Sequence, residues 1–344
     1  MENNARVADK FSALDLRRWR PSCISKSIQE QVSFVKESLL NILRCPATGD
    51  ALEIRNGKMQ NGEIWKGELV ATSGASYPII RGIPRFVGND QYASNFSLEW
   101  TVHKKTQLDT STYTKSSEEF AQKIGFTREE IEGKFVLDAG VGMGRFSDVA
   151  LKMGAQVVGA DLSFAVDSAY ENLGRNPNCH VVQADIFNLP FQKESFDFIY
   201  SIGVLHHTPN CKKAFLSLLP LLKPGGQIGI WVYSFVARYK RSDFLRRFTT
   251  KMPPKTLYGI VRTLLPVWEC LPRIPLVGRK IFNLVPVSVH PKREWRILDT
   301  FDWYSPKYQS KHTYEEVEGW FREAGLESIR RLSFPVSVRG KKPS

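Results

Sequence analysis

Cysteine is scarce in this chain, and the few cysteines follow no pattern. Five occur among 344 residues, at scattered positions without framework spacing: Cys23, Cys45, Cys179, Cys211 and Cys270. An odd and scattered set argues against a disulfide scaffold and favours a reducing compartment. We therefore expect a cytoplasmic protein.

Long apolar runs and internal repeats are also missing. The first six residues, Met-Glu-Asn-Asn-Ala-Arg, lack the apolar core of a signal peptide. No uninterrupted apolar run reaches the roughly 18–20 residues that a bilayer span requires. With 42% hydrophobic and 24% charged residues, the composition is that of a globular protein large enough for more than one domain.

Acidic residues become rare toward the C-terminus. Residues 1–233 hold 26 lysines and arginines against 25 aspartates and glutamates, whereas residues 234–344 hold 22 against 10. This asymmetry favours an anionic partner for the C-terminal third, such as phosphate, nucleic acid or a membrane surface. A solvated basic face is the alternative.

Composition and periodicity divide the chain. Asn56-Gly57 and Asn61-Gly62 are typical of hairpin turns and indicate short strands in the N-terminal region. We expect four parts: 1–30, a flexible arm; 31–90, a small β-rich domain; 91–130, a helical linker or lid; and 131–344, the main domain.

Apolar strands and helices alternate at the start of the main domain. This βαβ alternation predicts a parallel sheet with helices on both faces. The expected strands are 134–139, 156–160, 179–183, 196–202 and 226–233, and the expected helices lie near 144–154, 163–173 and 210–222.

Residues 234–312 interrupt this alternation. We expect short helices separated by prolines, forming a helical cap insertion too long to be a simple connection. A helix over 313–324 follows, beginning at a capping box of Thr313 and Glu316 and ending at Gly325. Two strands, 326–334 and 336–342, close the chain. The prolines of the cap are Pro253, Pro254, Pro266, Pro272, Pro275, Pro286 and Pro291.

Three glycines at alternate positions, Gly140, Gly142 and Gly144, follow the first strand of the main domain. Glycine permits the positive φ angles and close backbone approach that a ligand-binding loop needs. The pyrophosphate motif G-x-G-x-x-G would place its third glycine at Arg145. The leading Asp138 suits an ammonium or sulfonium group better than a pyrophosphate.

Two further acids end the next two strands. Asp161 is placed to accept hydrogen bonds from both hydroxyls of a ribose, and Asp185 suits the amino group of an adenine. Since the carboxyl ends of parallel strands share one edge, we expect a ligand crevice there.

These segments resemble the successive motifs of class I S-adenosylmethionine-dependent methyltransferases of the type 11-like group. The motifs occur in the family's order over about 100 residues, at 136–147, Asp161, Asp185, 196–207 and 222–226. The resemblance implies an α/β, Rossmann-like, seven-stranded, mostly parallel sheet whose last strand is antiparallel. A Rossmann-like domain that binds NAD, or binds nothing, is the alternative.

The resemblance also implies S-adenosyl-L-methionine as cofactor. Asp138 and the three glycines would hold its methionine end, Asp161 the ribose, and Asp185 with Ile186 the adenine. The predicted cofactor-binding set is Asp138, Ala139, Gly140, Gly142, Gly144, Asp161, Leu162, Asp185, Ile186 and Ser201.

Residues 39–87 resemble the zinc-ribbon-like domain related to the tRNA-methyltransferase activator family, through 43–46, 77–79 and 82–86. Thr48 replaces the second cysteine of a C-x-x-C pair, and a structural zinc site needs four ligands. We therefore expect a degenerate domain without zinc or another metal. It either orients the acceptor or is a structural appendage.

Methyl transfer relies mainly on alignment, and a base is needed only when the acceptor enters protonated. The candidate bases are His206 and His207, near the tip of the fourth strand; packing or capping is their alternative role. Aromatic and acidic residues around Asp299 and Asp302 predict an acceptor pocket, or else packing beneath the cap. The candidate acceptor contacts are Trp100, His103, Trp303, Tyr304, Tyr308 and His312.

We therefore predict an enzyme that methylates an oxygen or nitrogen of a small-molecule, glycan-linked or lipid-linked biosynthetic intermediate. The basic, amphipathic segment 234–296 suggests a phosphate-bearing acceptor, or peripheral contact with the inner membrane face. A tRNA or RNA methyltransferase and a non-catalytic scaffold that binds the cofactor are the alternatives.

Overall fold

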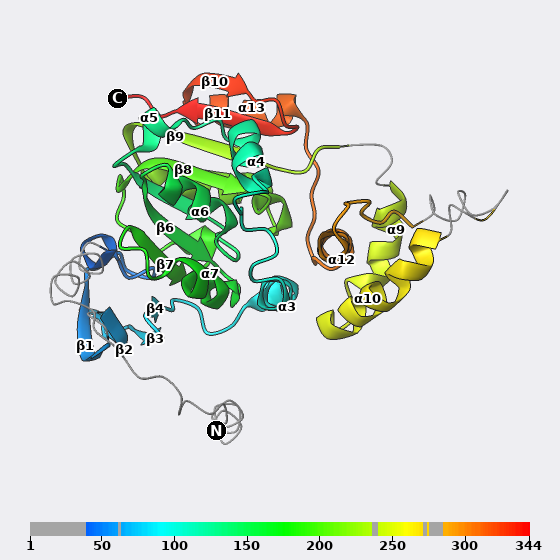
Figure 1. Ribbon diagram of the computed structural model, residues 1–344. Coiled ribbons are helices and arrows are strands. Elements are labelled where there is room, and N and C mark those ends of the chain that lie inside the picture. The colour runs from blue at the N-terminus through cyan, green and yellow to red at the C-terminus, as the bar shows by residue number, and fades with distance from the viewer. Residues whose placement is uncertain (1–38, 61–62, 236–239, 271–273, 275–284) are drawn as a thin grey trace.

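The alternating apolar segments of the main domain form one seven-stranded sheet (Figure 1). The computed structural model describes residues 39–60, 63–235, 240–270, 274 and 285–344. The order across the sheet is β10-β11-β9-β8-β5-β6-β7. The strands are β5 (Phe135–Ala139), β6 (Gln156–Asp161), β7 (Cys179–Gln183), β8 (Phe196–Ile202), β9 (Leu222–Trp231), β10 (Glu327–Arg331) and β11 (Ser337–Lys341).

The pairing of these strands confirms the predicted Rossmann-like fold. Strands β5 to β9 pair in parallel, whereas β11 runs antiparallel to both β9 and β10. The carboxyl ends of the parallel strands therefore meet at one edge, as the crevice prediction requires.

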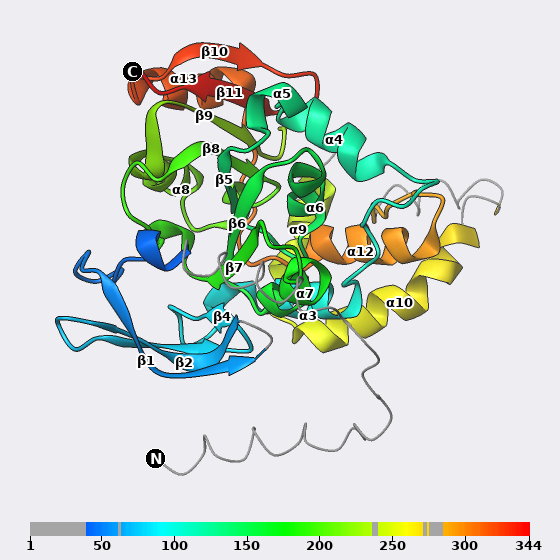
Figure 2. The ribbon, with the colours of Figure 1, turned by 60° about the vertical axis from the view of Figure 1, so that its left-hand side comes forward.

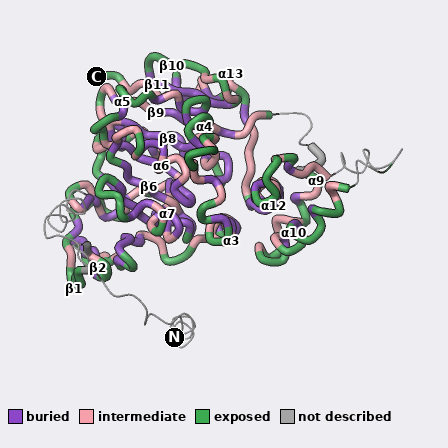
Figure 3. Tube along the Cα trace, viewed as in Figure 1, coloured by how far each residue is buried: buried purple, intermediate pink, exposed green. Residues whose placement is uncertain are grey.

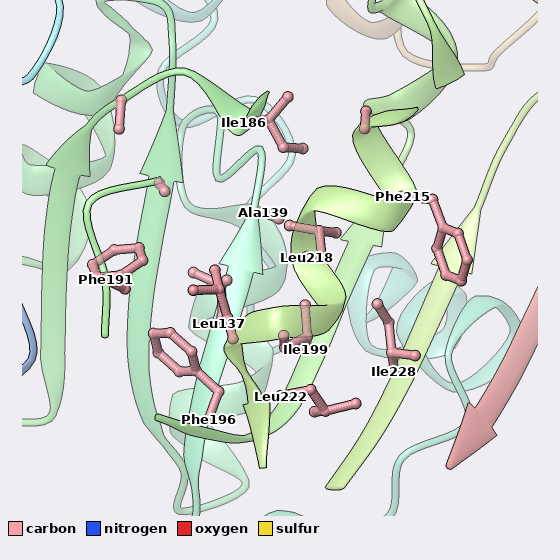
Figure 4. Packing of buried hydrophobic residues seen from close by; sticks show 14 of the residues in the cluster. Leu137, Ala139, Ile186, Phe191, Phe196, Ile199, Phe215, Leu218, Leu222 and Ile228 are labelled. Atoms are coloured by element: carbon pink, nitrogen blue, oxygen red, sulfur yellow. The ribbon is translucent and has the colours of Figure 1, made fainter. Parts of the chain in front are cut away.

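Helices cover both faces of the sheet because neighbouring strand residues point to opposite sides. Leu137 belongs to a cluster with residues of α8 and α13 on one face (Figure 4). Val136 belongs to a cluster with residues of α4 and α6 on the other face. Strands β5 to β9 and β11 are largely buried, whereas the edge strand β10 is mostly exposed (Figure 3). The covering helices are α4 (Lys115–Lys123), α5 (Arg128–Ile131), α6 (Arg145–Lys152), α7 (Ala165–Leu173), α8 (Cys211–Leu218) and α13 (Tyr314–Glu323).

Two expected boundaries of the main domain can be compared directly. Helix α13 begins after Thr313, whose hydroxyl accepts a hydrogen bond from the Glu316 N–H at 3.3 Å, and Gly325 follows it with φ of 72°. Strand β9 begins at Leu222, four residues before the expected start. It continues through 223–226 because its pairing with β8 tolerates a register shift near Phe196.

The N-terminal region forms a separate antiparallel sheet of order β1-β2-β3-β4 beside β7 (Figure 2). The expected hairpin turn at Asn56-Gly57 is wrong. These residues lie inside β1, where Asn56 has φ of 54° and the register shifts between Arg55 and Lys58, as in a β-bulge. The expected turn at 61–62 falls outside the described residues. The strands are β1 (Leu52–Gln60), β2 (Glu63–Ala71), β3 (Ser76–Ile80) and β4 (Ile83–Pro84).

The cap contains α9 (Lys240–Thr249), α10 (Pro254–Cys270) and α12 (Arg293–Tyr304), which lie beside the carboxyl edge of the sheet (Figures 1 and 2). The expected break at Pro266 is wrong, because this proline lies inside α10. Packing against α12 offsets the lost backbone hydrogen bond. The packed residues include Leu257, Val261, Leu265, Ile297 and Phe301.

Residues 91–130 connect the two sheets and are helical, as expected. Helix α3 (Ser94–Val102) follows a short 3-10 turn, η2 (Gln91–Ala93), and contacts α7 on one side and the cap helices on the other. This segment therefore bridges the sheet and the cap. The expected arm, 1–30, lies outside the described residues.

Candidate functional site

A cavity of about 440 Å³ lies where the carboxyl edge of the sheet meets α3, α4 and the cap. Its walls combine three parts of the chain that are distant in sequence. The loop after β5 contributes Gly140 and Gly142, the tip of β6 contributes Asp161, and the cap contributes Asp299 and Asp302. The crevice predicted at this edge is therefore a roofed cavity.

The glycine loop is tightly packed. Gly140 has φ of 98°, and a Cβ there would lie 2.3 Å from a methyl carbon of Val204. The Gly142 N–H donates to an Asp161 carboxylate oxygen at 2.9 Å, and the Trp100 ring covers the same glycine. The loop is thus held between the tip of β6 and α3, with its backbone facing the cavity.

Asp161 forms part of the cavity wall at the end of β6. Its second oxygen accepts hydrogen bonds from the Ser163 N–H at 2.8 Å and the Ser163 hydroxyl at 2.7 Å. Burial raises the pKa of Asp161, and the bonds from Ser163 and Gly142 oppose this rise. These bonds fix the orientation of the carboxylate toward the cavity.

The third predicted acid takes a supporting position. Asp185 accepts a hydrogen bond from the Phe187 N–H at 3.0 Å and caps the short helix η3 (Ile186–Asn188), while Ile186 lines the cavity. Burial, followed by the charges of Asp185 and Asp161, raises the pKa of the nearby Tyr92. Asp185 therefore lies close to the cavity without forming its wall.

Asp138 has a different place from the predicted one. Because side chains alternate along β5, Asp138 points to the same face as Val136, beneath α6. It accepts hydrogen bonds from Ser147 at 2.7 Å and Tyr200 at 3.1 Å, and burial raises its pKa to about 7. The carboxyl group therefore braces the glycine loop from below and does not line the cavity.

Of the four remaining predicted cofactor residues, two line the cavity and two support its wall. Ala139 and Leu162 line the cavity. Gly144 precedes α6, where a Cβ would meet Leu173 at 2.6 Å, and the Ser201 hydroxyl donates to the Ala139 carbonyl at 2.7 Å. These two positions maintain the loop and strand around the wall.

The two candidate histidines lie in η4 (Leu205–His207) in different environments. His207 lines the cavity, and its Nδ1 lies 3.0 Å from the Tyr308 carbonyl. Since a carbonyl only accepts, Nδ1 carries the proton and Nε2 keeps a lone pair, 3.9 Å from an Asp302 oxygen. Burial lowers the pKa of His207.

His206 is a packing residue in this structure. Its ring stacks on Tyr233 with centroids 3.8 Å apart, and its Nδ1 accepts a hydrogen bond from the Tyr233 N–H at 3.3 Å. It does not line the cavity. Of the two candidate bases, His207 lines the cavity and His206 does not.

The predicted acceptor residues separate into two groups. Trp100 and Trp303 line the cavity. His103 contacts the Tyr258 hydroxyl at 2.9 Å, and the Tyr304 hydroxyl donates to the Pro286 carbonyl at 2.7 Å. On α12, Asp299, Asp302 and Trp303 share the cavity face, whereas Tyr304 faces the interior of the cap.

Tyr308 and His312 also lie outside the cavity wall. The Tyr308 ring packs edge-on against Tyr92, and His312 lies 3.0 Å from Glu316. His103 and Tyr308 thus connect the cap with residues 91–130, whereas Tyr304 forms its contact within the cap.

The sequence analysis missed a group of charged side chains beside the glycine loop. Glu119 lies 2.8 Å from Lys123, 3.1 Å from Arg145 and 3.7 Å from Lys115. Burial raises the pKa of Glu119, but the three cations outweigh it and bring the pKa to about 2. All four line the cavity. Lys115, Glu119 and Lys123 are spaced four residues apart on α4, a spacing that places them on one helix face, whereas only the packing of α4 against α6 brings Arg145 to them.

Two further wall residues had no place in the prediction, Glu99 of α3 and Tyr233 after β9, whereas Trp295 of α12 begins the stretch 295–312 that was expected to contact the acceptor. Glu99 is 1% exposed. An isolated glutamate in a polar helix carries no signal of burial, so only the tertiary contact with the cap identifies it.

Within the described ranges, no group of three or more histidine, cysteine, aspartate or glutamate side chains is arranged to hold a metal ion. The Cys45 thiol lies 3.3 Å from the Tyr77 hydroxyl. None of the helices described has the length and apolar character needed to cross a bilayer.

Residues 137–230 match the model of a family described as a methyltransferase domain. This segment is similar to that methyltransferase domain. The match covers β5 to β9, including the glycine loop, Asp161 and His207. The matched segment contains most of the residues for which the motif order predicted an S-adenosylmethionine site.

Curated relatives are similar to parts of this chain. Probable tRNA methyltransferase 9B from Homo sapiens is 35% identical over 128 residues, covering 35% of this chain and 26% of that protein. Phosphoethanolamine N-methyltransferase 1 from Arabidopsis thaliana is 28% identical over 211 residues, covering 60% and 40%. The chain thus spans about a quarter of the length of the first relatives it matches.

Solved structures were also compared. Phosphoethanolamine N-methyltransferase 2 from Haemonchus contortus, in complex with S-adenosyl-L-methionine, is 16% identical with a TM-score of 0.42. The alignment covers 74% of this chain and 47% of that one. The acceptors named for the relatives differ, so the acceptor must be sought in the cavity itself.

Proposed function

We propose that this protein is an S-adenosylmethionine-dependent methyltransferase that acts on an oxygen or nitrogen of an acceptor held in the cavity. The observation that carries the proposal is the continuity of one cavity. It joins the predicted cofactor residues Gly142, Asp161 and Ile186 to His207 and to Asp302 of the cap.

The described residues fit the cofactor. Gly140 and Gly142 expose backbone where side chains would clash, and Asp161 presents a carboxylate to a ribose. Arg145 and Lys123 supply positive charge for the cofactor's carboxylate beside the loop. When bound, S-adenosylmethionine supplies a methyl group on a positively charged sulfur.

The chain's own contribution is alignment and protection from water. The cap roofs the cavity and holds the acceptor beside the cofactor residues, which is the main source of acceleration in such a displacement. His207 presents a neutral Nε2 to the cavity and can take a proton from the acceptor nucleophile.

Binding and turnover test this proposal separately. We expect the full chain to bind S-adenosylmethionine and S-adenosylhomocysteine in calorimetry, and to release S-adenosylhomocysteine when fractionated small molecules are added. His207→Ala should lower turnover by roughly 100-fold or more, since general bases contribute about 10²–10⁴-fold, without changing cofactor affinity. Absence of cofactor binding would overturn the proposal; binding without transfer would indicate a scaffold.

We propose further that the acceptor is presented at an anionic membrane surface. The outer surface of the cap exposes Phe244 and Phe248 at 58% and 59%, one helical turn apart on α9. Leu264 and Val267 of α10 are also exposed. Arg247 lies between the two phenylalanines in sequence, so apolar and basic groups occur together, as in helices that bind membrane interfaces.

Sedimentation with lipid vesicles tests whether the outer surface of the cap binds an anionic membrane. The full chain should sediment with vesicles containing anionic phosphatidylglycerol and much less with neutral phosphatidylcholine. Replacing Phe244 and Phe248 by serine should abolish sedimentation, whereas Met59→Ser, an equally exposed position on β1, should not. A wild-type protein that stays in the supernatant contradicts the membrane proposal.

RNA methylation is the second candidate, favoured by the positive C-terminal third and by relatives named as tRNA methyltransferases. It requires salt-dependent binding of tRNA, because phosphate contacts release counterions. Filter binding between about 50 and 200 mM salt measures this directly. Affinity that does not fall with salt excludes it.

The likeness of 39–87 to a degenerate zinc-ribbon-like domain is also kept as a proposal. Cys45 is buried against Tyr77, and burial raises the pKa of Tyr77 to about 12. Elemental analysis of the purified chain tests the proposal of a metal-free domain. One bound zinc ion per chain would overturn it.

A further inference from the structure

Three carboxyl groups meet in the cavity beneath the cap. Glu99 comes from α3, and Asp299 and Asp302 come from α12. We propose that this group selects a positively charged amine, whose nitrogen is the atom that becomes methylated. The inference rests on the proposed function and narrows its acceptor from an oxygen or nitrogen nucleophile to an amine.

Glu99 is the most informative member. Its side chain is 1% exposed, and its Oε2 has no hydrogen-bond partner among the described residues. Burial, then the charges of Asp302 and Asp299, raises its pKa well above the ordinary range. A buried carboxyl group without a partner is costly. Since Glu99 faces a cavity, its missing donor is expected from a ligand.

Asp299 and Asp302 face the cavity with only neutral donors at hydrogen-bond distance. Asp299 accepts a hydrogen bond from Ser288 at 2.9 Å, and Asp302 accepts one from Tyr233 at 2.6 Å. Burial, together with Asp302, raises the pKa of Asp299 to about 6. The pair therefore adds negative potential to the region around Glu99.

The nearby cations contact groups other than these three carboxyl groups. Lys115 and Arg145 influence Asp299, but both pair with Glu119 on α4. Arg246 influences Asp302, yet its guanidinium donates to the carbonyls of Trp303 and Pro306. Among the described residues, no lysine or arginine forms an ion pair with Glu99, Asp299 or Asp302, so an ammonium group would be their direct ionic partner.

Aromatic side chains complete the environment. Phe96, Trp100, Tyr233 and Trp303 line the same cavity. Aromatic faces attract cations, most strongly where water is excluded. Carboxylates and aromatic rings together favour an alkylammonium group over a phosphate or a neutral hydroxyl.

The same residues account for activation of the amine. An ammonium nitrogen has no lone pair, so its proton must first pass to a carboxylate of the cluster or to the His207 Nε2. The freed nitrogen lone pair then forms the new N–C bond while the bond between methyl and sulfur breaks, and its electrons stay on the sulfur. Atoms and charge balance without another reactant.

Matched probes test the inference on the full chain saturated with S-adenosylhomocysteine. Benzylamine, benzyl alcohol and benzoate share one skeleton and differ in charge. We expect calorimetry to detect binding of benzylamine and no binding of benzyl alcohol or benzoate. Glu99→Gln keeps the shape and removes the carboxyl group that can ionise when an ammonium group binds, and it should weaken benzylamine binding by roughly 10-fold or more. Glu118→Gln, on the exposed face of α4, is the control and should bind like the wild type.

The unfolding temperature and the binding of S-adenosylhomocysteine show which of the two proposals has failed. Glu99→Gln should unfold at the wild-type temperature or above it, because it removes an unpartnered buried carboxyl group, so lost binding would not reflect misfolding. Equal binding of benzyl alcohol or benzoate, or unchanged benzylamine affinity in Glu99→Gln, would overturn the amine proposal alone. Failure to bind S-adenosylhomocysteine would overturn the proposed function itself.

Discussion

Asp138 is a buried carboxyl group whose proton is linked to folding. Its pKa rises from an ordinary 3.8 to about 7 through burial. The folded state therefore holds a proton that the unfolded state has released between these values. Its contribution to stability is fully present below about pH 4 and is lost as pH rises toward 7, by about 1.4 kcal/mol for each pKa unit of difference.

Asp138→Asn should remove this part of the pH dependence. The amide oxygen still accepts from Ser147 and Tyr200, but the residue no longer titrates. Urea unfolding between pH 4 and 8 measures the slope for each variant. Asp148→Asn, on the outer face of α6, should keep the wild-type slope. Parallel curves for Asp138→Asn and the wild type would contradict the assigned burial effect.

Asp161 links the glycine loop to the expected ribose position. Asp161→Asn removes the negative charge toward the ribose and weakens the acceptor of the Gly142 N–H. Hydrogen bonds to charged groups contribute about 1.5–3 kcal/mol, so S-adenosylmethionine affinity should fall roughly 10- to 100-fold. Calorimetry measures the change. An unaltered affinity would place the ribose elsewhere.

The β5–α6 loop depends on glycine for space as well as for conformation. At Gly140, with φ of 98°, an added Cβ would meet the Val204 side chain at 2.3 Å. We expect Gly140→Ala to cost about 1–3 kcal/mol of folding stability and to weaken cofactor binding strongly.

A double variant separates the clash with Val204 from the strain of the positive φ angle. Val204→Ala removes the methyl groups nearest the added Cβ, so the pair Gly140→Ala with Val204→Ala should recover part of the loss. The strained φ angle should keep it below the wild type. A double-mutant cycle in denaturant measures the coupling between the two sites. Simple additivity would show that the Val204 contact does not decide the effect.

The assembled cavity predicts a selective thermal response of the whole protein. S-adenosylhomocysteine at about 100 times its Kd should stabilise the fold by roughly 2.7 kcal/mol. NAD at the same concentration should produce no shift, because the loop lacks the pyrophosphate glycine and has Arg145 in its place. Scanning calorimetry of the full chain distinguishes these outcomes. Stabilisation by NAD instead would favour a dinucleotide-binding domain.

The cap has two surfaces that differ in charge. Residues 234–312 include only five acidic residues: Asp243, Glu269, Glu294, Asp299 and Asp302. Asp299 and Asp302 line the cavity, while the outer surface of the cap carries exposed phenylalanines and arginines. The basic composition therefore describes the outside of the cap, and the wall that faces the acceptor has the opposite character.

Much of this architecture follows from local pattern. The βαβ alternation, the glycine loop and the strand-ending Asp161 depend on neighbouring residues, since periodicity and positive φ angles are properties of short segments. The same locality explains the error at Asn56-Gly57, where a turn signal became a bulge because β1 pairs with β2 beyond it.

The acceptor side of the cavity depends on contacts between distant segments. Glu99, His207 and Asp302 come together only when α3 and the cap close over the sheet edge. Helical spacing places Asp299, Asp302 and Trp303 on one face, but it does not say whether that face meets solvent, the interior of the cap or a ligand. Packing between helices decides this, because burial, and with it each residue's charge and pKa, is a property of the assembled chain.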